Sequence, residues 1–560
     1  MGVHRTGQVR GFGLNTRISI RNFAGTLLAL ALLCSGLAGC SGAGSGSNSA
    51  GNSAGPSTLV FGRNKDAVSL DPAVVTDGNS LNVAKEVFEG LTRYRLGSFD
   101  IEPGLATSWT IGNNGKAWKF HLRHGVTFQD GTPFDAAAVK FNFDRWRLKD
   151  NPYHKSLQAG EGYSYYASQF GGFPGVIADV KVIAPDQVEF DLTQPVAPFL
   201  ANLAMPAFGL GSPTAMKKEG EDYFRQPVGT GPYQVSEWVK DDHITLKAYP
   251  GYWGPKAKIN TVILRDIPDA ATSMLALQKG EIDGWEYPRP DDLNAITADH
   301  NLTLYHQPPN NLLYLAIQTE KPPFNNVLVR RAINQAIDAR ALVHNFYDPS
   351  ASLATDLLPL AVWPHPSRTS YDYNPAAARR LLAQAGFPHG FSTTLWYMTL
   401  PRPYVPEPQR VAEAIQANLR DVGIIARLEG MEWGPYLDKT EKGEHNLALF
   451  GWTGDNGDPD NFLYSILDKD AAIPPGAQNV CFWKDENFHR LMMLGQTTID
   501  RSTRAKYYLQ SLELIHDQAP MVPLVHTAPP IAFKRTVLGY IPSPDNSEPF
   551  EVMSVLPGNG

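Results

Sequence analysis

The sequence predicts an α/β protein with two lobes or more. About 500 residues follow the first 57, and a chain of that length exceeds a single ordinary hydrophobic core. From about residue 311 onward, segments with the period of strands alternate with segments with the period of helices. Such alternation is typical of a mostly parallel sheet whose strands are joined by crossover helices.

The segments before residue 311 combine short predicted strands with turns. Residues 117–122 alternate apolar and polar side chains, as a half-buried strand does, and residues 182–192 repeat the pattern with a break at Pro185-Asp186. Further strand-like segments lie at residues 58–62, 259–265 and 302–306, and a helical pattern at residues 270–278.

The segments after residue 311 follow a more regular order. The predicted strands are residues 312–318, 392–398, 424–431 and 446–452, and the predicted helices are residues 327–346, 375–386, 409–422 and 504–517. Asn374 and Pro375 suit the N-cap and first turn of the second helix, and Gly386 suits its end. These segments are assigned to a second lobe.

The first 39 residues have the pattern of a secretory signal peptide. The segment before residue 24 carries four arginines and no acidic residue, and residues 24–33 are almost all apolar. That run is too short to cross a membrane, which takes about 20 apolar residues. Residues 37–40, Leu-Ala-Gly-Cys, resemble the lipobox of bacterial lipoproteins, which implies cleavage before Cys40 and lipidation of its sulfur. A small-residue cleavage site with an incidental cysteine is the alternative.

Residues 41–57 consist almost entirely of Ser, Gly, Asn and Ala. This composition cannot bury a core and behaves as a flexible chain with a reach of roughly 20–25 Å. Directly after a lipidated cysteine, such a segment is a tether. The sequence therefore predicts a lipid anchor and tether over residues 40–57.

Cysteine usage and charge exclude several classes of function. Cleavage and lipidation would leave Cys481 as the one free thiol, so no internal disulfide, cysteine-based zinc site or redox pair is expected, and Cys481 is expected to be buried. The leader holds four basic residues and no acidic one, so its removal changes the net charge from −7 to −11. An acidic chain without a Lys/Arg-rich run is a poor nucleic-acid binder.

Motifs of catalysis and of metal binding are missing from the sequence. It contains no phosphate loop, no dinucleotide fingerprint, no His-Glu-x-x-His and no Gly-x-Ser-x-Gly. The acid-rich residues 455–460 lack the glycine and the glutamate that a calcium loop requires. We therefore expect no catalytic residue, no metal and no cofactor.

Several segments together resemble one known family. The longest, residues 118–134, reads Trp-Lys-Phe-His-Leu-Arg-His-Gly-Val-Thr-Phe-Gln-Asp-Gly-Thr-Pro-Phe. It is preceded by Ala-Thr-Ser-Trp at 106–109 and followed by Val-Gly-Thr-Gly-Pro-Tyr at 228–233 and Gly-Tyr-Trp at 251–253. These segments resemble the family 5 solute-binding proteins of bacterial ABC importers. The similarity runs from about residue 58 to the C-terminus.

Within that family the chain looks most like the dipeptide-binding branch. The matching segments are residues 151–155, 402–404, 451–462 and 516–520. The resemblance implies a two-lobed periplasmic-binding-protein-like fold of type II, of the large cluster-C type, with two crossing hinge strands. It implies lobe I at residues 58–310 with an extra subdomain at about 95–225, lobe II at 311–524, and a return to lobe I at 525–560.

Polar residues that follow two of the predicted strands are the candidate ligand contacts. Arg402 follows the strand ending at Met398, in a Pro-rich loop, and Asp455 follows the strand ending at Trp452, in a Gly-rich turn. Ligands of α/β sheets bind beyond strand ends. The resemblance implies that Asp455 accepts the ammonium protons of a dipeptide and that Arg402 holds its carboxylate through the guanidinium fork. Fixing both partners would also fix ligand length.

The same resemblance implies further ligand contacts, with Trp452, Tyr404 and Met398 as pocket walls and Gly451 and Gly454 as points of close backbone approach. Each assignment has a structural alternative. Asp455 could serve turn chemistry, and Arg402 could be a solvated loop charge. Trp452 and Met398 could simply belong to the core.

The function implied is that of a non-enzymatic, extracytoplasmic component of an ABC importer, lipid-anchored in the periplasm or on the outer face of the membrane. It would bind dipeptides by lobe closure as a monomer and deliver them to the permease. Haem, longer oligopeptides and signalling peptides are alternative ligands for the same fold. Residues after Tyr404 depart from the dipeptide-binding pattern, which leaves the length of the ligand open. A remote alternative is an extracytoplasmic hydrolase using His516-Asp517, but adjacent helical side chains do not face one site.

Overall fold

The computed structural model describes residues 57–154, 162–366, 371–474 and 476–556. The chain divides into a unit of residues Met1–Ser53 and a unit of residues Ala54–Gly560, and the fold below belongs to the second. The predicted signal peptide, the lipidation at Cys40 and nearly all of the tether lie outside the described residues. None of the helices within these described ranges has the length and apolar character of a membrane span.

A seven-stranded sheet combines strands from both ends of the chain, in the order β12-β19-β11-β1-β10-β9-β8. Its strands are β1 (Thr58–Arg63), β8 (Tyr233–Val239), β9 (His243–Ala248), β10 (Thr261–Asp266), β11 (Gly284–Glu286), β12 (Leu302–His306) and β19 (Pro530–Lys534). The late strand β19 pairs antiparallel with both β11 and β12, and β11 in turn pairs parallel with β1. Fully buried Phe61 and Phe533 stack with ring centroids 5.6 Å apart.

A four-stranded antiparallel sheet, in the order β4-β5-β7-β6, forms a separate core. Its strands are β4 (Ala106–Gly112), β5 (Ala117–Leu122), β6 (Ile177–Ala184) and β7 (Gln187–Leu192). The break predicted at Pro185-Asp186 is the turn of the β6–β7 hairpin. We call the elements around this sheet and the seven-stranded sheet lobe I.

The remaining elements of lobe I are short. Its helices are α1 (Gly78–Val87), α2 (Ala136–Arg147), α3 (Ser164–Phe170), α4 (Phe199–Leu203), α5 (Pro213–Glu219), α6 (Ala270–Lys279) and α7 (Pro290–Ala298). Two small hairpins pair β2 (Thr92–Tyr94) with β3 (Ile101–Pro103) and β20 (Val537–Leu538) with β21 (Ser554–Val555).

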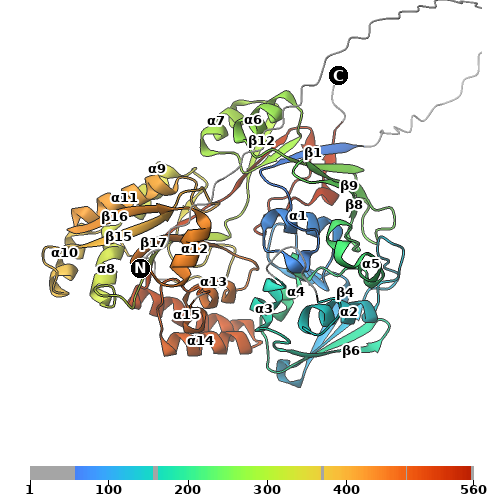
Figure 1. The fold of residues 1–560 in the computed structure, drawn as a ribbon, viewed down its shortest axis with the longest axis horizontal. Coiled ribbons are helices and arrows are strands. Elements are labelled where there is room, and N and C mark those ends of the chain that lie inside the picture. The colour runs from blue at the N-terminus through green and yellow to red at the C-terminus, as the bar shows by residue number, and fades with distance from the viewer. Residues whose placement is uncertain (1–56, 155–161, 367–370, 475, 557–560) are drawn as a thin grey trace, which may run out of the picture. The chain divides into compact units, whose positions relative to one another are not determined.

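Lobe II is built on a six-stranded sheet in the order β14-β18-β13-β17-β15-β16. Its strands are β13 (Asn311–Ile317), β14 (Ser352–Leu353), β15 (Phe391–Met398), β16 (Ile424–Met431), β17 (Leu447–Thr453) and β18 (Met521–His526). Its helices are α8 (Val327–Ala336), α9 (Ala339–Phe346), α10 (Pro375–Gln384), α11 (Pro408–Asp421), α12 (Trp433–Glu441), α13 (Asp460–Leu467), α14 (Glu486–Thr497) and α15 (Arg501–Gln518). In Figure 1 these elements run from yellow-green to red.

The prediction of a mostly parallel sheet in lobe II is wrong. β15 pairs parallel with β16 and β17, whereas the β17–β13, β13–β18 and β18–β14 pairs are antiparallel. The connections to lobe I explain the difference. The chain enters lobe II at the start of β13 and leaves it at the end of β18, so two strands that meet at one hinge run in opposite directions.

The prediction of one helix over residues 327–346 is also wrong, because this segment forms two helices, α8 and α9. Ile337 has an extended conformation (φ −98°, ψ 123°) that ends α8, and the Asp338 carboxylate accepts the N–H of Ala341 to cap α9. The limits predicted for α10 are confirmed. Asn374 caps its start, and Gly386 follows its end with a φ of 93°.

Two crossing segments join the lobes, one between β12 and β13 and the other between β18 and β19. They are hydrogen-bonded to each other. The N–H of Gln307 donates to the Pro529 carbonyl at 2.9 Å. Buried Asn311 donates to the Thr527 carbonyl at 3.0 Å, and its Oδ1 accepts the N–H of Thr527 at 2.9 Å. The predicted pair of hinge strands is therefore present and tied together.

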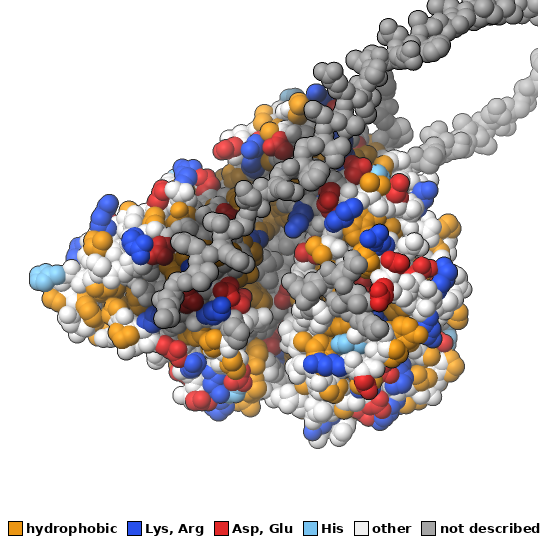
Figure 2. Space-filling view, viewed as in Figure 1, with side chains coloured by type: hydrophobic (Ala, Val, Ile, Leu, Met, Phe, Trp, Pro, Cys, Tyr) orange, Lys and Arg blue, Asp and Glu red, His pale blue; other side chains and the backbone are white. Residues whose placement is uncertain are grey.

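Charges of both signs are interspersed among the described side chains on the face drawn in Figure 2. Proteins that bind nucleic acid gather basic side chains on one surface. Whether the protein binds nucleic acid stays a prediction from its composition.

Two glycines allow β15 and β16 to start side by side. Gly390 precedes β15 and has a φ of 74°, and a Cβ there would lie 1.9 Å from the carbonyl oxygen of Gly423, which precedes β16. The two strands pair from their first residues, Phe391 with Ile424. The start of this pair therefore requires a residue without a side chain.

We expect Gly390→Ala to lower the free energy of unfolding much more than Gly386→Ala. Both glycines have positive φ, which costs an alanine about 1–2 kcal/mol, but no atom lies within 4 Å of a Cβ at Gly386. Urea denaturation of the two variants measures the difference, expected to exceed about 2 kcal/mol. Equal losses would contradict the close backbone contact.

Candidate functional site

Arg402 and Asp455 follow two neighbouring parallel strands. The predicted strands 392–398 and 446–452 correspond to β15 and β17, which pair at Leu395 with Leu447 and at Trp396 with Ala448. Parallel strands end at the same edge of a sheet, so both loops emerge at one edge. That edge is also where β13 begins, because its first residue pairs with the last residue of β17.

The Arg402 loop is a tight turn fastened to a crossing segment. The N–H of Arg402 donates to the Val405 carbonyl at 3.0 Å, and the N–H of Val405 donates back to the Arg402 carbonyl at 2.9 Å. The hydroxyl of Thr527 donates to the Pro403 carbonyl at 2.9 Å. The second crossing segment therefore holds the loop that carries Arg402.

The guanidinium of Arg402 is half-buried and has no anionic partner among the described residues. Its Cζ lies 3.8 Å from the ring centroid of Trp433, and its Nε is buried without a hydrogen-bond acceptor in the described part of the chain. Burial lowers the pKa of Arg402. A desolvated guanidinium that lacks an internal carboxylate is suited to an anion supplied by a ligand.

The turn that carries Asp455 is fastened to the other crossing segment. The side-chain amide of Asn310 donates to the Gly454 carbonyl at 2.7 Å, and the N–H of Gly454 donates to the Asn310 carbonyl at 2.8 Å. Each crossing segment thus holds one of the two charged loops.

The carboxylate of Asp455 is held by two neutral donors from different lobes. The Tyr165 hydroxyl, from α3 in lobe I, donates to Oδ1 at 2.8 Å, and Asn461 Nδ2 donates to Oδ2 at 2.8 Å. Burial raises the pKa of Asp455, while these two hydrogen bonds oppose the rise by favouring the charged form. No Lys, Arg or His of the described ranges forms an ion pair with this carboxylate.

The predicted wall residues differ in exposure. Trp452 is half-buried and its Nε1 donates to Asn461 Oδ1 at 3.2 Å. Tyr404 is almost buried, and Met398 is fully buried in the core of lobe II. Packing in this core explains the presence of Met398. Contact of a ligand with Met398, Trp452 or Tyr404 stays a prediction.

Gly451, inside β17, and Gly454, in the turn after it, have packing reasons that sequence reasoning missed. A Cβ at Gly451 would lie 2.3 Å from Cδ2 of Tyr404, and one at Gly454 would lie 2.5 Å from Oδ1 of Asn310. The space beside each glycine is therefore filled by the protein itself. Close approach of a ligand to Gly451 and Gly454 stays a prediction.

The acid-rich residues after Asp455 are used inside the protein. Asp458 forms a buried bidentate ion pair with Arg504, with N–O distances of 2.7 and 2.8 Å. Asn456 donates to Asn202 Oδ1 in lobe I at 3.0 Å. These contacts give the turn a structural role alongside any role in binding.

Three residues near the charged pair were not predicted. Nothing in the sequence indicates that Tyr165 contacts Asp455, because Tyr165 lies far away in the sequence, on a helix of the other lobe. Trp433 follows β16 and reaches Arg402 only through the fold. Asn461 lies inside the matched segment 451–462, and its spacing from Asp455 could have identified it.

The pair suggested for a hydrolase lies at the opposite edge of the sheet. His516 and Asp517 are at the end of α15, just before β18 begins, whereas Arg402 and Asp455 lie where β18 ends. The His516 ring stacks on Tyr371 with centroids 4.3 Å apart. The binding loops and this pair therefore do not form one site.

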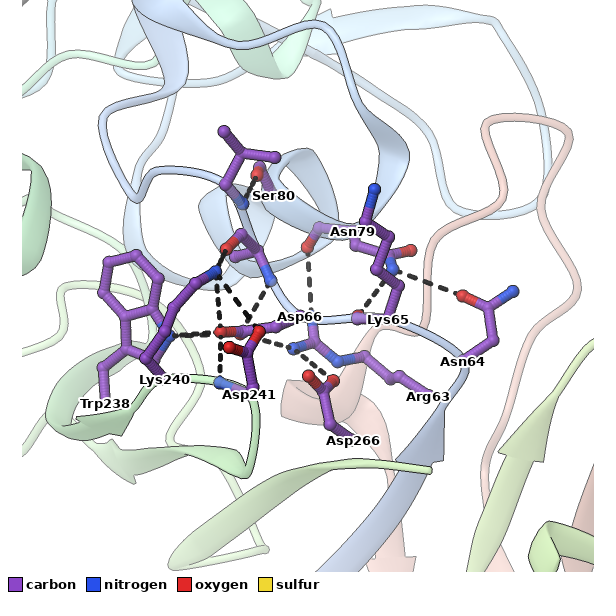
Figure 3. A network of polar contacts seen from close by, with 12 residues as sticks. Arg63, Asn64, Lys65, Asp66, Asn79, Ser80, Trp238, Lys240, Asp241 and Asp266 are labelled. Carbon is purple, nitrogen blue, oxygen red and sulfur yellow. Dashed lines mark hydrogen bonds and ion pairs between the residues drawn. The ribbon is translucent and has the colours of Figure 1, made fainter. Parts of the chain in front are cut away.

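A second group of carboxylates lies at the ends of β1 and β10 and in the β8–β9 turn (Figure 3). One oxygen each of Asp66, Asp241 and Asp266 lies within 4.8 Å of the others. Arg63 Nη2 is 3.8 Å from Asp66 and 3.7 Å from Asp266, and Lys240 Nζ is 3.0 Å from Asp66. Burial raises the pKa of Asp266 to about 6, against the charge of Arg63. Arg63 and Lys240 thus supply positive charge to these carboxylates, and their ion pairs link the segments that follow the strands.

We expect Asp458→Ala to destabilise the protein by about 3–5 kcal/mol, because it leaves the buried Arg504 unpaired. Asp438→Ala is the control, since the Asp438–Lys442 pair is exposed and its loss should cost less than about 1 kcal/mol. Thermal and urea unfolding measure both effects. A loss for Asp458→Ala as small as that of the control would contradict a structural role for the buried pair.

Residues 100–473 match the family described as bacterial extracellular solute-binding proteins, family 5 middle. The dipeptide-binding protein of Escherichia coli K12 is 35% identical over 511 residues, covering 89% of this chain and 94% of that protein. Heme-binding protein A of Haemophilus influenzae is 33% identical over 512 residues, covering 89% of this chain and 92% of that protein.

A solved structure of similar fold is that of an ABC transporter-associated periplasmic binding protein from Helicobacter pylori in complex with the peptide STSA. It has a TM-score of 0.77 and 34% sequence identity, and the match covers 89% of this chain and 98% of that one. Both the sequence and the two-lobed fold agree with the family expected from the motifs. The chain therefore belongs to the bacterial extracellular solute-binding proteins of family 5.

Proposed function

We propose that this protein is the lipid-anchored, extracytoplasmic solute-binding component of an ABC importer, that it binds dipeptides by lobe closure, and that it delivers them to the permease. The observation that carries the proposal is the pair Arg402 and Asp455. They have opposite charges, they lie at one sheet edge, and neither has a counter-ion among the described residues.

A free dipeptide matches this pair chemically. It is a zwitterion, and removing either charge from water without a partner costs several kcal/mol. The planar guanidinium of Arg402 can hold a carboxylate through two hydrogen bonds. Asp455 retains acceptor capacity beyond the bonds from Tyr165 and Asn461, since a carboxylate offers about four lone-pair sites.

The attachment of both loops to the crossing segments supports a preference for ligand length. Thr527 holds the Arg402 loop and Asn310 holds the Asp455 turn, while the crossing segments bond to each other. A ligand whose two charges are spaced to meet both partners would gain both interactions. A longer peptide would lose one unless a loop moved.

Closure of the lobes is supported by contacts between them near Asp455. The Tyr165 hydroxyl reaches Asp455, Asn456 reaches Asn202, and the N–H of Ala197 donates to the Gln496 carbonyl at 2.7 Å. Closure would remove water from the ligand and strengthen its charged contacts.

Longer peptides are the second candidate ligand. The Helicobacter pylori relative is in complex with the four-residue peptide STSA. Haem remains a third candidate through the relative named heme-binding protein A. The Arg402–Asp455 pair favours a zwitterion over haem.

The remaining assignments complete the proposal. Lobe I would comprise residues 58–310, with the subdomain at about 95–225, and residues 525–560, and lobe II would comprise residues 311–524. Cys40 would carry the lipid, and residues 41–57 would tether a monomeric body to the membrane. The protein would bind its solute without chemical change.

Calorimetric titration of ligand-free protein should show dipeptides binding far more tightly than single amino acids or pentapeptides. Arg402→Ala and Asp455→Ala should each lose about 2–5 kcal/mol of binding free energy, because a ligand charge is left unpaired. Arg427→Ala is the control, since Arg427 is an exposed arginine of the same lobe that pairs with Glu429. Normal binding by both site variants would rule out this site.

The anchor is tested by Cys40→Ser. Expressed in bacteria, the unchanged protein should sediment with the membrane fraction and become soluble only with detergent. The variant should lose the lipid mass measured by mass spectrometry and leave the membrane fraction. Unchanged membrane association of the variant would contradict lipidation at this cysteine.

A further inference from the structure

Asn461, at the start of α13, joins two of the proposed ligand contacts through one side chain. Its Nδ2 donates to Asp455 Oδ2 at 2.8 Å. Its Oδ1 accepts the N–H of Asp455 at 2.9 Å and Nε1 of Trp452 at 3.2 Å. Asn461 is 4% exposed, so these bonds are shielded from water.

The partners fix which way the amide of Asn461 points. The N–H of Asp455 and the indole N–H of Trp452 can only donate, so they require the amide oxygen. The carboxylate of Asp455 requires a donor, so it faces the amide nitrogen. A reversed amide would place two donors against its nitrogen and a carboxylate against its oxygen.

These bonds restrict both proposed ligand contacts at once. The Asp455 side chain is tied to its own backbone through Asn461, which holds the carboxylate in one orientation. The indole of Trp452 is tied to the same amide. Sites that recognise a charge depend on such support, because a contact displaced by about 1 Å loses much of its strength.

We propose that Asn461 is a positioning residue that holds the Asp455 carboxylate and the Trp452 indole in place to receive the ammonium end of the ligand. The proposal rests on the proposed function of the Asp455 turn. Asn461 itself makes its bonds to the protein and acts on the ligand through its two partners.

The charge of Asp455 gives a readout that a purely structural role would not change. Burial raises the pKa of Asp455, and the bonds from Asn461 and Tyr165 oppose that rise. Loss of the Asn461 bond therefore raises the pKa further. Binding of an ammonium needs the ionised carboxylate, so affinity is lost as the pH falls through this pKa, and the variant loses it at higher pH.

Another carboxylate of this turn, Asp460, titrates near neutral pH, because burial and the charge of Asp458 raise its pKa to about 7. Tyr165 donates from α3, and Tyr94 of β2 has a pKa held well above its ordinary value, chiefly by burial. Asp458, in the same turn, is paired with Arg504. Asp460 accepts a hydrogen bond from Gln496 and is present in the unchanged protein and in an Asn461 variant alike, so the readout is the difference between their acid midpoints.

The test is calorimetry of Asn461→Ala across acidic to neutral pH, with a free dipeptide and with its N-acetylated form, which lacks the ammonium. At neutral pH we expect affinity for the free dipeptide to fall about tenfold and affinity for the acetylated form to change less than about twofold. The acid midpoint of free-dipeptide binding should move to higher pH.

Asn334→Ala is the matched control. Asn334 is also 4% exposed in lobe II and donates to the Arg330 and Met521 carbonyls. Its loss should reduce stability without changing the acid midpoint or the discrimination between the two ligands. If Asn461→Ala does not fold, the same measurements are made on Asn461→Leu, whose side chain has the same number of non-hydrogen atoms and the same branching at Cγ.

Equal losses for the two ligands, or an unchanged acid midpoint, would overturn the positioning role. This outcome is distinct from failure of the proposed function. If the proposed function failed, the unchanged protein would bind no dipeptide, or Asp455→Ala would bind dipeptide as well as the unchanged protein does.

Discussion

The parallel pairing of β15 with β17 is the constraint on which the proposed site depends. Only two residue pairs, Leu395 with Leu447 and Trp396 with Ala448, set the register between these strands. They place the ends of both strands at one sheet edge, where loops can carry polar groups that a strand interior could not. A one-residue slip would turn every side chain of one strand to the other face.

The crossing segments connect that edge to lobe I. Asn310 and Thr527 each hold one charged loop, and Asn311 binds Thr527 directly. A hinge that flexed within these bonds would disturb the site. In the proposed closure, the site of lobe II would therefore move as one body, and the contact of Tyr165 with Asp455 would form as lobe I meets it.

Much of this architecture could be predicted from local patterns. Strand alternation located β15 and β17 to within a residue, and the polar residues beyond them followed. The prediction of a single helix over 327–346 was wrong because the helical spacing of apolar residues continues across Ile337 and Asp338. Asp338 instead caps the start of a second helix. The mixed sheet was missed because strand direction depends on where the chain enters and leaves the lobe.

Contacts between distant segments were beyond sequence reasoning. Nothing near Tyr165 indicates that its hydroxyl meets a carboxylate of the other lobe. Nothing in the sequence around Gly451 indicates that the ring of Tyr404 fills the space where a Cβ would lie. The ion pair of Asp458 with Arg504 likewise depends on how α15 packs against the turn. Such pairings arise from tertiary packing, which local periodicity does not encode.

The most direct test of the account is a crystal structure with a bound dipeptide. We predict that the ligand ammonium lies about 3 Å from the carboxylate of Asp455 and that its carboxylate lies about 3 Å from the guanidinium of Arg402. Asn461 should keep its bonds to Asp455 and Trp452. A ligand that paired either charge with other residues, or that occupied a different part of the protein, would contradict the account.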